Sequence, residues 1–233
     1  MPSSPVALVT GASKGIGLQI ALHLADNGYK VVGCSRSQPE KPVVGIEHLV
    51  ADVSDEKSVR SIFRTIRDKY GRLDAVICNA GIASMNPVLL TPKASMSRML
   101  ETNVIGTILV AREAARLLRK SPSGRIVTLS TVAVPLKIEG ESVYSASKAA
   151  VEQFTKMIAR EFAPFGITCN CIGPGPVETD LIAGVPKETM EEFAEKLVGG
   201  KISSFDDVIN VIDFFLSDSS QAVTGQVIYL GGA

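Results

Sequence analysis

The 233-residue sequence has no net charge, no long apolar segment and no leader-like N-terminus. Its 24 lysine and arginine residues balance 24 aspartate and glutamate residues, so no charge excess favours a polyanionic partner such as nucleic acid. No stretch approaches the roughly 20 consecutive apolar residues that span a bilayer. The first residues, MPSSPVALV, lack the basic region and apolar run of a signal peptide. These absences predict a cytoplasmic protein that binds neither nucleic acid nor membranes.

Cysteine and histidine are also scarce, with four and two residues. The cysteines form no C-x-x-C pair and have no histidine at metal-binding spacing, which predicts buried, reduced thiols and no metal site. Neither histidine has a nucleophile nearby in the sequence, so we do not expect a catalytic triad. The residues concerned are Cys34, Cys78, Cys169, Cys171, His23 and His48.

The sequence does contain a glycine-rich turn between a predicted strand and a predicted helix. The apolar run Val6–Val9 precedes Gly11, Gly15 and Gly17, and apolar residues then recur at helical spacing as far as Leu24. Glycines let such a turn approach a pyrophosphate, which the N–H groups and dipole of the helix N-terminus bind. The spacing differs from the G-x-G-x-x-G of many dinucleotide-binding folds, and a plain strand–helix connection is the alternative.

The rest of the chain alternates apolar strands with amphipathic helices. Strands without polar alternation are typical of a parallel sheet covered on both faces. We therefore predict one α/β domain over residues 1–233, a Rossmann fold with a doubly wound parallel sheet of about seven strands and ligands at the carboxyl ends of the strands. The expected strands are Val6–Val9, Val31–Ser35, His48–Val53, Ala75–Cys78, Arg125–Ser130, Thr168–Ile172 and Gln226–Leu230.

Helix boundaries follow from capping residues and apolar periodicity. Ser54 is expected to cap the helix after the third strand, and Gly71 to end it. A capping box of Ser204 and Asp207 predicts the start of the last helix. Two long helices are expected at about Met96–Lys120 and at Ser142–Ala163.

Tyr144 and Lys148 lie four residues apart on the second long helix and so share one face. A nearby cation can lower a tyrosine pKa from about 10 by roughly 1–3 units, toward the range useful for a general acid. Alone, the pair also fits a solvated helix face. Here the helix follows the fifth strand, whose carboxyl end borders the cleft, and this position favours catalysis.

Six motifs in this order resemble the short-chain dehydrogenase/reductase family, and the resemblance covers essentially the whole chain. Within the family the sequence is similar to the 3-oxoacyl-(acyl-carrier-protein) reductases and related carbonyl reductases. The resemblance implies an enzyme that moves a hydride between a nicotinamide cofactor and a carbonyl or an alcohol. The motifs are Thr10-Gly11-x-x-x-Gly15-Ile16-Gly17, Asp52-Val53, Asn79-Ala80-Gly81, Asn103, Tyr144-x-x-x-Lys148 and Pro174-Gly175-Pro176-Val177-Glu178-Thr179.

By this resemblance Tyr144 donates the proton during reduction, and Lys148 holds the nicotinamide ribose and lowers the tyrosine pKa. Asn103 keeps a water at the end of a proton relay, Asp52 meets the adenine and Thr179 the carboxamide. A structural asparagine and a strand-end cap are the alternatives for Asn103 and Asp52. The implied cofactor-binding residues are Gly11, Ser13, Lys14, Gly15, Ile16, Gly17, Ser35, Arg36, Asp52, Val53, Asn79, Ala80, Gly81, Tyr144, Lys148, Pro174, Gly175, Val177 and Thr179.

The end of the second strand favours NADP(H) over NAD(H). An NAD-specific site places a carboxylate there, which binds the ribose 2′-hydroxyl and repels a 2′-phosphate. This sequence has Ser35 followed by Arg36, and Lys14 lies in the glycine turn. Two cations and no anion predict NADPH as the cofactor; the alternative is that both are solvated surface charges.

The predicted substrate cleft is apolar, which fits an acyl thioester, a ketone or a ring system as a small-molecule carbonyl substrate. Pro122 and Phe165 stand where the resembling reductases carry basic residues that dock the carrier protein, although Arg119, Lys120 and Arg125 lie nearby. The expected walls are Ile82, Met85, Val132, Val134, Leu136 and Leu181–Val185, and a lid is expected after Pro186 with Met190, Phe193 and Leu197.

The family's serine at the end of the fifth strand stands thirteen residues before the tyrosine, and here that position is Thr131. Adjacent strand residues point to opposite faces, so only one of Ser130 and Thr131 can face the cleft unless the strand has already ended before them, and the register from Asn103 also selects Thr131. We predict that Thr131 polarises the carbonyl and that Ser130 is structural. The Thr131 hydroxyl keeps the donor and acceptor chemistry of serine, and the threonine side chain adds a methyl group and a stiffer χ1.

Two alternative functions and an oligomeric state also follow from the sequence. An NAD-linked alcohol or sugar dehydrogenase and a non-catalytic dinucleotide-binding redox sensor are the alternative functions; the missing carboxylate at Ser35 argues against the first, and intact catalytic positions argue against the second. Apolar residues beyond one face of both long helices predict a homotetramer, with a homodimer as the alternative.

Overall fold

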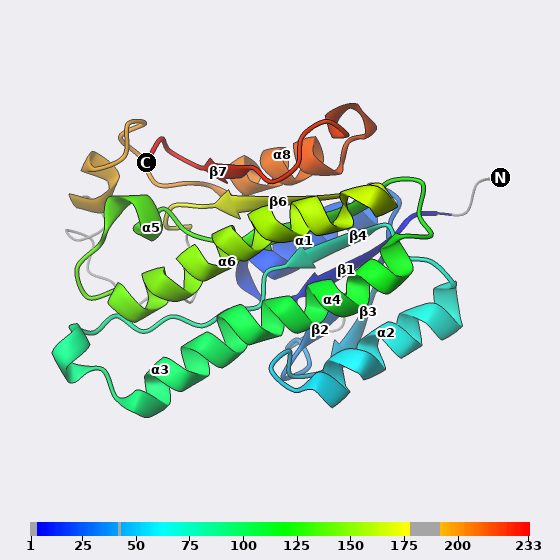
Figure 1. Ribbon diagram of the computed structural model, residues 1–233, viewed down its shortest axis with the longest axis horizontal. Helices are drawn as coiled ribbons and strands as arrows, with labels where there is room; N and C mark the ends of the chain where they lie inside the picture. The colour runs from blue at the N-terminus through cyan, green and yellow to red at the C-terminus, as the bar shows by residue number, and fades with distance from the viewer. Residues whose placement is uncertain (1–3, 42, 178–191) are drawn as a thin grey trace.

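The computed structural model describes residues 4–41, 43–177 and 192–233 (Figure 1). Seven strands form one parallel sheet in the order β3-β2-β1-β4-β5-β6-β7, so the chain winds outward in both directions from β1 and β4. This is the predicted doubly wound Rossmann arrangement. The strands are β1 (Val6–Thr10), β2 (Lys30–Ser35), β3 (Ile46–Val50), β4 (Ala75–Cys78), β5 (Gly124–Leu129), β6 (Ile167–Gly173) and β7 (Val227–Tyr229).

Helices cover both faces of the sheet, as Figure 1 shows with α4 and α6 in front of it and α1 behind it. Apolar residues of α2, α4 and α6 form one buried cluster against the sheet, and those of α1 and α8 form the other. Burying one such side chain contributes about 1.5–3 kcal/mol, so the two apolar layers hold the strand ends in fixed positions. The helices are α1 (Gly15–Asp26), α2 (Glu56–Tyr70), α3 (Lys93–Leu100), α4 (Gly106–Leu118), α5 (Ala133–Leu136), α6 (Ser142–Phe162) and α8 (Phe205–Leu216).

The α2 helix begins one residue later than predicted. Asp52 accepts hydrogen bonds from both the N–H and the hydroxyl of Ser54, which uses Ser54 in a turn before the helix. Asp55 is the N-cap instead, and its carboxylate accepts from the N–H groups of Lys57 and Ser58. The prediction that Ser54 caps this helix is therefore wrong, while Gly71 ends it as expected.

Two other elements differ from the predictions by more than one residue at a boundary. β3 pairs with β2 from Ile46 to Val50, because the chain leaves the sheet before Asp52 to make the turn that precedes α2. The helix predicted at Met96–Lys120 starts at Lys93 and contains a π-helical turn, Glu101–Ile105, between α3 and α4. The capping box of Ser204 and Asp207 is confirmed at the start of α8.

All four cysteines are free and buried, as predicted. Within the described residues, no helix is long and apolar enough to cross a membrane. In the same part of the chain, no group of three His, Cys, Asp or Glu side chains is arranged to hold a metal ion.

Candidate active site

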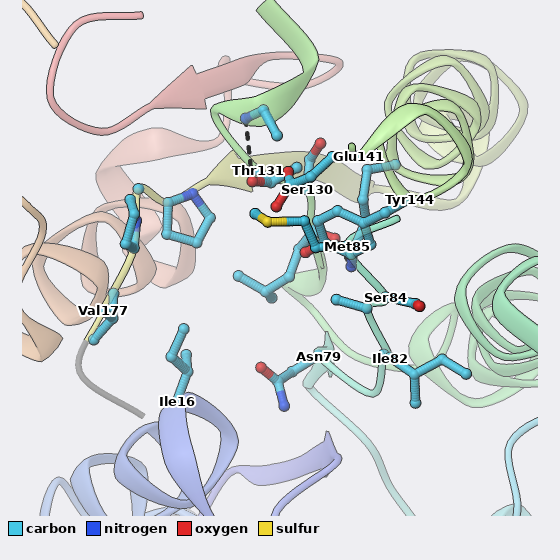
Figure 2. Close-up of a pocket in the computed structure, with 18 of the residues that line it drawn as sticks. Ile16, Asn79, Ile82, Ser84, Met85, Ser130, Thr131, Glu141, Tyr144 and Val177 are labelled. Atoms are coloured by element: carbon cyan, nitrogen blue, oxygen red, sulfur yellow. Dashed lines mark hydrogen bonds between the residues drawn. The ribbon is translucent and has the colours of Figure 1, made fainter. Parts of the chain in front are cut away.

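Two cavities lie side by side at the carboxyl edge of the sheet. One, of about 520 Å³, is lined by the glycine turn and the ends of β1, β2 and β4. The other, of about 240 Å³, is lined by residues after β4, β5 and β6 and by Tyr144 and Lys148 (Figure 2). Both include Ile16, Asn79 and Gly81 in their walls, so the two spaces meet at the end of β4.

The glycine turn forms a cradle that side chains would fill. Gly11 and Gly15 adopt φ angles of +70° and +58°, which other residues rarely adopt. A Cβ atom on Gly17 would lie 2.3 Å from the carbonyl oxygen of Gly11, so this position requires glycine. The turn leads into the N-terminus of α1, where free N–H groups and the helix dipole favour an anion. This arrangement fits the pyrophosphate of a dinucleotide.

Thr10 and Asn79 join the glycine turn to the end of β4. The buried Thr10 hydroxyl accepts from the N–H groups of Asn79 and Ala80, at 3.1 and 3.0 Å. In return, the Asn79 amide donates to the carbonyl oxygens of Thr10 and Gly11, at 2.9 and 3.2 Å. Asn79 was predicted as a site residue from its motif, but the anchoring role of Thr10 was not.

Most of the other residues predicted around the dinucleotide line the larger cavity. Asp52 lines it while one carboxylate oxygen binds Ser54, so the cap suggested as its alternative role is present as well. Arg36 is exposed at the rim. The other predicted residues in this wall are Gly11, Ser13, Lys14, Gly15, Ile16, Gly17, Ser35, Val53, Asn79, Ala80 and Gly81.

Tyr144, Lys148 and Thr131 meet in the smaller cavity, as predicted from their spacing. Figure 2 shows Thr131 and Tyr144 on the same cavity wall, with Ser130 beside them. The Lys148 ammonium lies 5.9 Å from the centroid of the Tyr144 ring and donates one hydrogen bond, of 2.8 Å, to the carbonyl oxygen of Leu129. Gly81 leaves room for this ammonium, because a Cβ atom there would lie 3.3 Å from the Lys148 Nζ.

Burial controls the protonation of this pair in the protein without ligand. It lowers the pKa of Lys148 from 10.5 to about 8. Burial, followed by the charge of Glu141, raises the pKa of Tyr144, and a hydrogen bond with Thr131 opposes the change. The expected lowering of the Tyr144 pKa is thus not what the protein alone produces, because burial and the Glu141 carboxylate both raise this pKa.

Ser130 also lines this cavity, but it is buried and its hydroxyl is bonded to the core. Its hydroxyl donates to one oxygen of the buried Glu152 carboxylate, and Tyr229 donates to the other oxygen at 2.7 Å. This network connects the ends of β5, α6 and β7. The Ser130 hydroxyl is thus used in a structural hydrogen bond, although both Ser130 and Thr131 line the cavity.

Asn103 lies in the π-helical turn and is completely buried. Its amide exchanges two 2.9 Å hydrogen bonds with the backbone of Ile82 and donates a third to the Ser147 hydroxyl. Ser147 donates in turn to the carbonyl oxygen of Tyr144 at 2.6 Å. The Asn103 side chain therefore fixes the loop after β4 to α6. Ser147 forms the link to α6 in this network, and it was not predicted from the sequence.

Several predicted substrate-contacting residues lie elsewhere. Val132 is fully buried and Leu197 is 3 % exposed, so neither reaches the cavity wall. Val134 and Leu136 are also absent from that wall; Ala133, Glu141 and Ser84 contribute to it instead. Ile82, Met85, Phe193, Pro174, Gly175 and Val177 line it, whereas Thr179, Leu181–Val185, Pro186 and Met190 lie outside the described residues.

Arg125 does not serve as an exposed docking residue. It is 2 % exposed, and its guanidinium donates to the backbone carbonyls of Gly124 and Ser217. Of the three basic residues suggested near the fifth strand, only Arg119 and Lys120 are exposed.

Comparison with known proteins identifies the family. Residues 11–232 match the family model described as Enoyl-(Acyl carrier protein) reductase. The chain belongs to the short-chain dehydrogenase/reductase family. This short-chain dehydrogenase/reductase is accordingly an oxidoreductase, from a family that binds nicotinamide dinucleotides.

The chain is similar in sequence to other proteins of this family and similar in fold to a solved structure. The chain is 30% identical to the 3-oxoacyl-[acyl-carrier-protein] reductase FabG of Escherichia coli (strain K12), with 97% of this chain and 96% of that protein covered. It is 35% identical to a short-chain type dehydrogenase/reductase of Picea abies, over 97% and 91% of the two chains. The ligand-free aldohexose dehydrogenase AldT of Thermoplasma acidophilum has a TM-score of 0.91 and 27% identity, over 98% and 93%.

Proposed function

We propose that this short-chain dehydrogenase/reductase reduces a carbonyl compound to an alcohol with NADPH, with Tyr144 as the proton donor. The observation that carries the proposal is the meeting of Tyr144, Thr131 and the buried Lys148 in a cavity that adjoins the glycine turn. When bound, the dinucleotide supplies the hydride. The protein supplies a proton, a hydroxyl that polarises the carbonyl and a largely apolar cavity wall.

The protonation of Tyr144 suits reduction. Its raised pKa keeps the hydroxyl protonated at neutral pH, ready to donate to the carbonyl oxygen as negative charge develops there. Thr131, which lines the same cavity, would turn its one hydroxyl proton from Tyr144 to the same carbonyl oxygen once the substrate is bound. Lys148 holds the nicotinamide ribose and, once its ammonium has that partner, stabilises the tyrosinate formed by proton donation.

Asn103 and Asp52 have supporting parts in this proposal. The backbone carbonyl of Asn103, which accepts from the Thr107 hydroxyl at 2.7 Å, is the group that would hold the relay water through which Lys148 reprotonates Tyr144. Asp52 lines the adenine end with its second oxygen. Thr179, the residue proposed to meet the carboxamide, lies outside the described residues.

Selectivity for NADPH is proposed from the charges around the larger cavity. Ser35, at the end of β2, offers a neutral hydroxyl, and Arg36 and Lys14 add two cations to the same wall. A 2′-phosphate would gain charge-assisted hydrogen bonds there. An NAD-linked alcohol or sugar dehydrogenase is the second candidate, because the similar AldT structure is that of an aldohexose dehydrogenase.

The substrate is proposed to be a 3-oxoacyl thioester or a similar ketone. The similarity to FabG supports the thioester, and the apolar residues Ile82, Met85 and Val177 offer a surface for an acyl chain. The consumption of NADPH and of NADH should be measured with acetoacetyl thioesters, diketones, quinones, simple ketones and aldohexoses. Turnover of a ketone with NADPH supports the proposal. A preference for NADH, or cofactor binding without turnover of any of these compounds, would overturn it.

We propose a homotetramer as the working assembly. Ile105, at the end of the π-helical turn, and Met157 of α6 remain 46 % and 47 % exposed on the isolated chain, which supports apolar contacts through both long helices. Light scattering at micromolar concentration tests this, and a monomeric mass would refute it.

A further inference from the structure

The His48 side chain of β3 lies against Gly33, the glycine of β2. It pairs across the two strands with Gly33. A Cβ atom on Gly33 would lie 3.2 Å from the His48 Nδ1, so the imidazole occupies space that any larger residue at position 33 would contest. The ring is therefore held directly beside the strand that ends at Ser35.

The hydrogen bonds of Ser35 determine the state of this imidazole. The Ser35 hydroxyl donates to the carbonyl oxygen of Ser37 at 2.7 Å, which uses its one proton. The His48 Nε2 lies 2.7 Å from the same hydroxyl oxygen and must therefore be the donor in that contact. Burial lowers the pKa of His48, so at neutral pH the ring is uncharged and carries its proton on Nε2.

No other polar side chain competes strongly for the ring. Among the described residues, those that line the small hollow beside His48 include no carboxylate and no cation: they are Ala12, Leu18, Gln38, Pro39, Val43 and Ile46. The bonded chain from His48 through Ser35 to the Ser37 carbonyl is thus the main polar support of this corner. Arg36 lies between the two bonded positions, and Ser35, Arg36 and Ser37 all line the dinucleotide cavity.

We propose that His48 is a positioning residue for the 2′-phosphate of the cofactor. It holds the Ser35 hydroxyl on the Ser37 carbonyl and so fixes the backbone between these two residues, which keeps Arg36 in place before the phosphate arrives. The residue lies outside every motif that identifies the family. The inference rests on the proposed NADPH preference and assigns one reason for it.

Ligands with and without the 2′-phosphate provide the test. Calorimetry should give dissociation constants for NADP⁺, NAD⁺, adenosine 2′,5′-bisphosphate and 5′-AMP with the unaltered protein and with His48→Phe, His48→Asn and His48→Gln. Phenylalanine keeps the ring shape without a donor, asparagine keeps a donor that is too short to reach Ser35, and glutamine places its amide nitrogen near the position of Nε2. Circular dichroism and the melting temperature check that each variant is folded.

We expect His48→Phe and His48→Asn to bind NADP⁺ and the bisphosphate about tenfold more weakly, the effect of one lost hydrogen bond. Binding of NAD⁺ and 5′-AMP should not change, and His48→Gln should recover most of the loss. Equal weakening of all four ligands, or no change in any, would refute the role of His48 while the unaltered protein still prefers NADP⁺. If the unaltered protein does not prefer NADP⁺, the proposed cofactor and this inference both fail.

Discussion

The amino and carboxyl ends of the strands, called here the amino edge and the carboxyl edge, each contain a buried charged side chain, and the two differ in how many hydrogen bonds they make. At the amino edge, the Asp74 carboxylate accepts from Val6, Arg72 and Ser121, which together satisfy both oxygens. At the carboxyl edge, the Lys148 ammonium has one hydrogen bond to a described residue, although it can donate three.

The difference appears in the direction of the pKa shifts. Burial alone would raise the pKa of Asp74, but its hydrogen bonds to Arg72 and Ser121 lower it below the usual value, so the charged form is stabilised. Burial lowers the pKa of Lys148 and disfavours its charged form. A charge with all its bonds supplied by the protein supports the fold, whereas one with unused donors is ready for a ligand. Variants at the two edges should therefore separate activity from stability.

The largest effect is expected from Tyr144→Phe. Removing the hydroxyl removes the proton donor, and we expect turnover to fall by about 10³-fold, within the range for general acids. Steady-state rates with a ketone and NADPH measure this, and cofactor affinity and melting temperature should change little. A variant that keeps a tenth of the activity would show that another group donates the proton.

The next effect separates two adjacent hydroxyls. Thr131→Ala should reduce turnover by ~10²–10³-fold with nearly unchanged NADPH affinity, because a donor to the developing oxyanion is lost. Thr131→Ser should retain activity. Ser130→Ala should instead leave catalysis mostly intact and cost about 1–3 kcal/mol in unfolding free energy, since Glu152 loses a buried donor. The opposite pattern would mean that the assigned strand register is wrong.

Lys148→Met should remove the part of the pH dependence of the unfolding free energy that Lys148 causes. The folded pKa of about 8 lies below the unfolded value of 10.5, so the unfolded chain binds more protons between these values and stability rises with pH there. The difference corresponds to on the order of 3 kcal/mol. Urea unfolding at pH 7.5 to 10 should show Lys148→Met more stable than the unaltered protein at the lower pH, with the gap closing as pH rises. A constant gap would contradict the burial argument.

Asp74→Asn tests the amino edge. We expect a loss of about 2 kcal/mol in unfolding free energy, because the charge-assisted bonds to Arg72 are lost in a partly buried site. The folded pKa is lowered, so this contribution is present above the unfolded pKa and disappears as the pH falls through the folded pKa. The ratio kcat/KM at neutral pH should stay unchanged; a large change would show that the two edges are coupled.

The smallest effect concerns Glu141, which faces the substrate cavity in Figure 2. Its charge contributes to the raised pKa of Tyr144, after burial. Glu141→Gln should therefore lower that pKa and move the alkaline decline of the reduction rate to lower pH. The pH profile of kcat measures the shift, and an unchanged or higher midpoint would refute it. Glu139→Gln, which alters a neighbouring carboxylate outside the cavity wall, is the matched control.

Sequence periodicity was sufficient for the fold and for much of the site geometry. Tyr144 and Lys148 line one cavity because helical residues four apart share a face. The alternation of strand side chains does not separate Ser130 from Thr131, because β5 ends at Leu129 and both residues line that cavity. The Glu152 carboxylate continues the same four-residue spacing beyond Lys148, so its position near the site could also have been found from the sequence.

The features that were missed depend on contacts between distant residues. The π-helical turn at Asn103 is stabilised by the Ile82 backbone and by Ser147, and no local propensity indicates it. Ser54 and Asp55 are both good caps, and the choice between them depends on the turn made by Asp52. Val132, predicted in the cavity wall, and Leu197, predicted in the lid, are both buried outside the cavity lining, because hydrophobicity alone does not distinguish a substrate-contacting residue from a core residue.

The reactivity of the buried cysteines reports how often the sheet opens. Cys34, Cys78 and Cys171 lie on three parallel strands, and burial raises the pKa of each thiol to about 12, so few thiolates exist at neutral pH. Alkylating reagents can reach them only when strands part. The rate of maleimide modification therefore measures how often the centre of the sheet opens, and a ligand that closes the Gly11 turn over Cys34 should slow the reaction at that residue first.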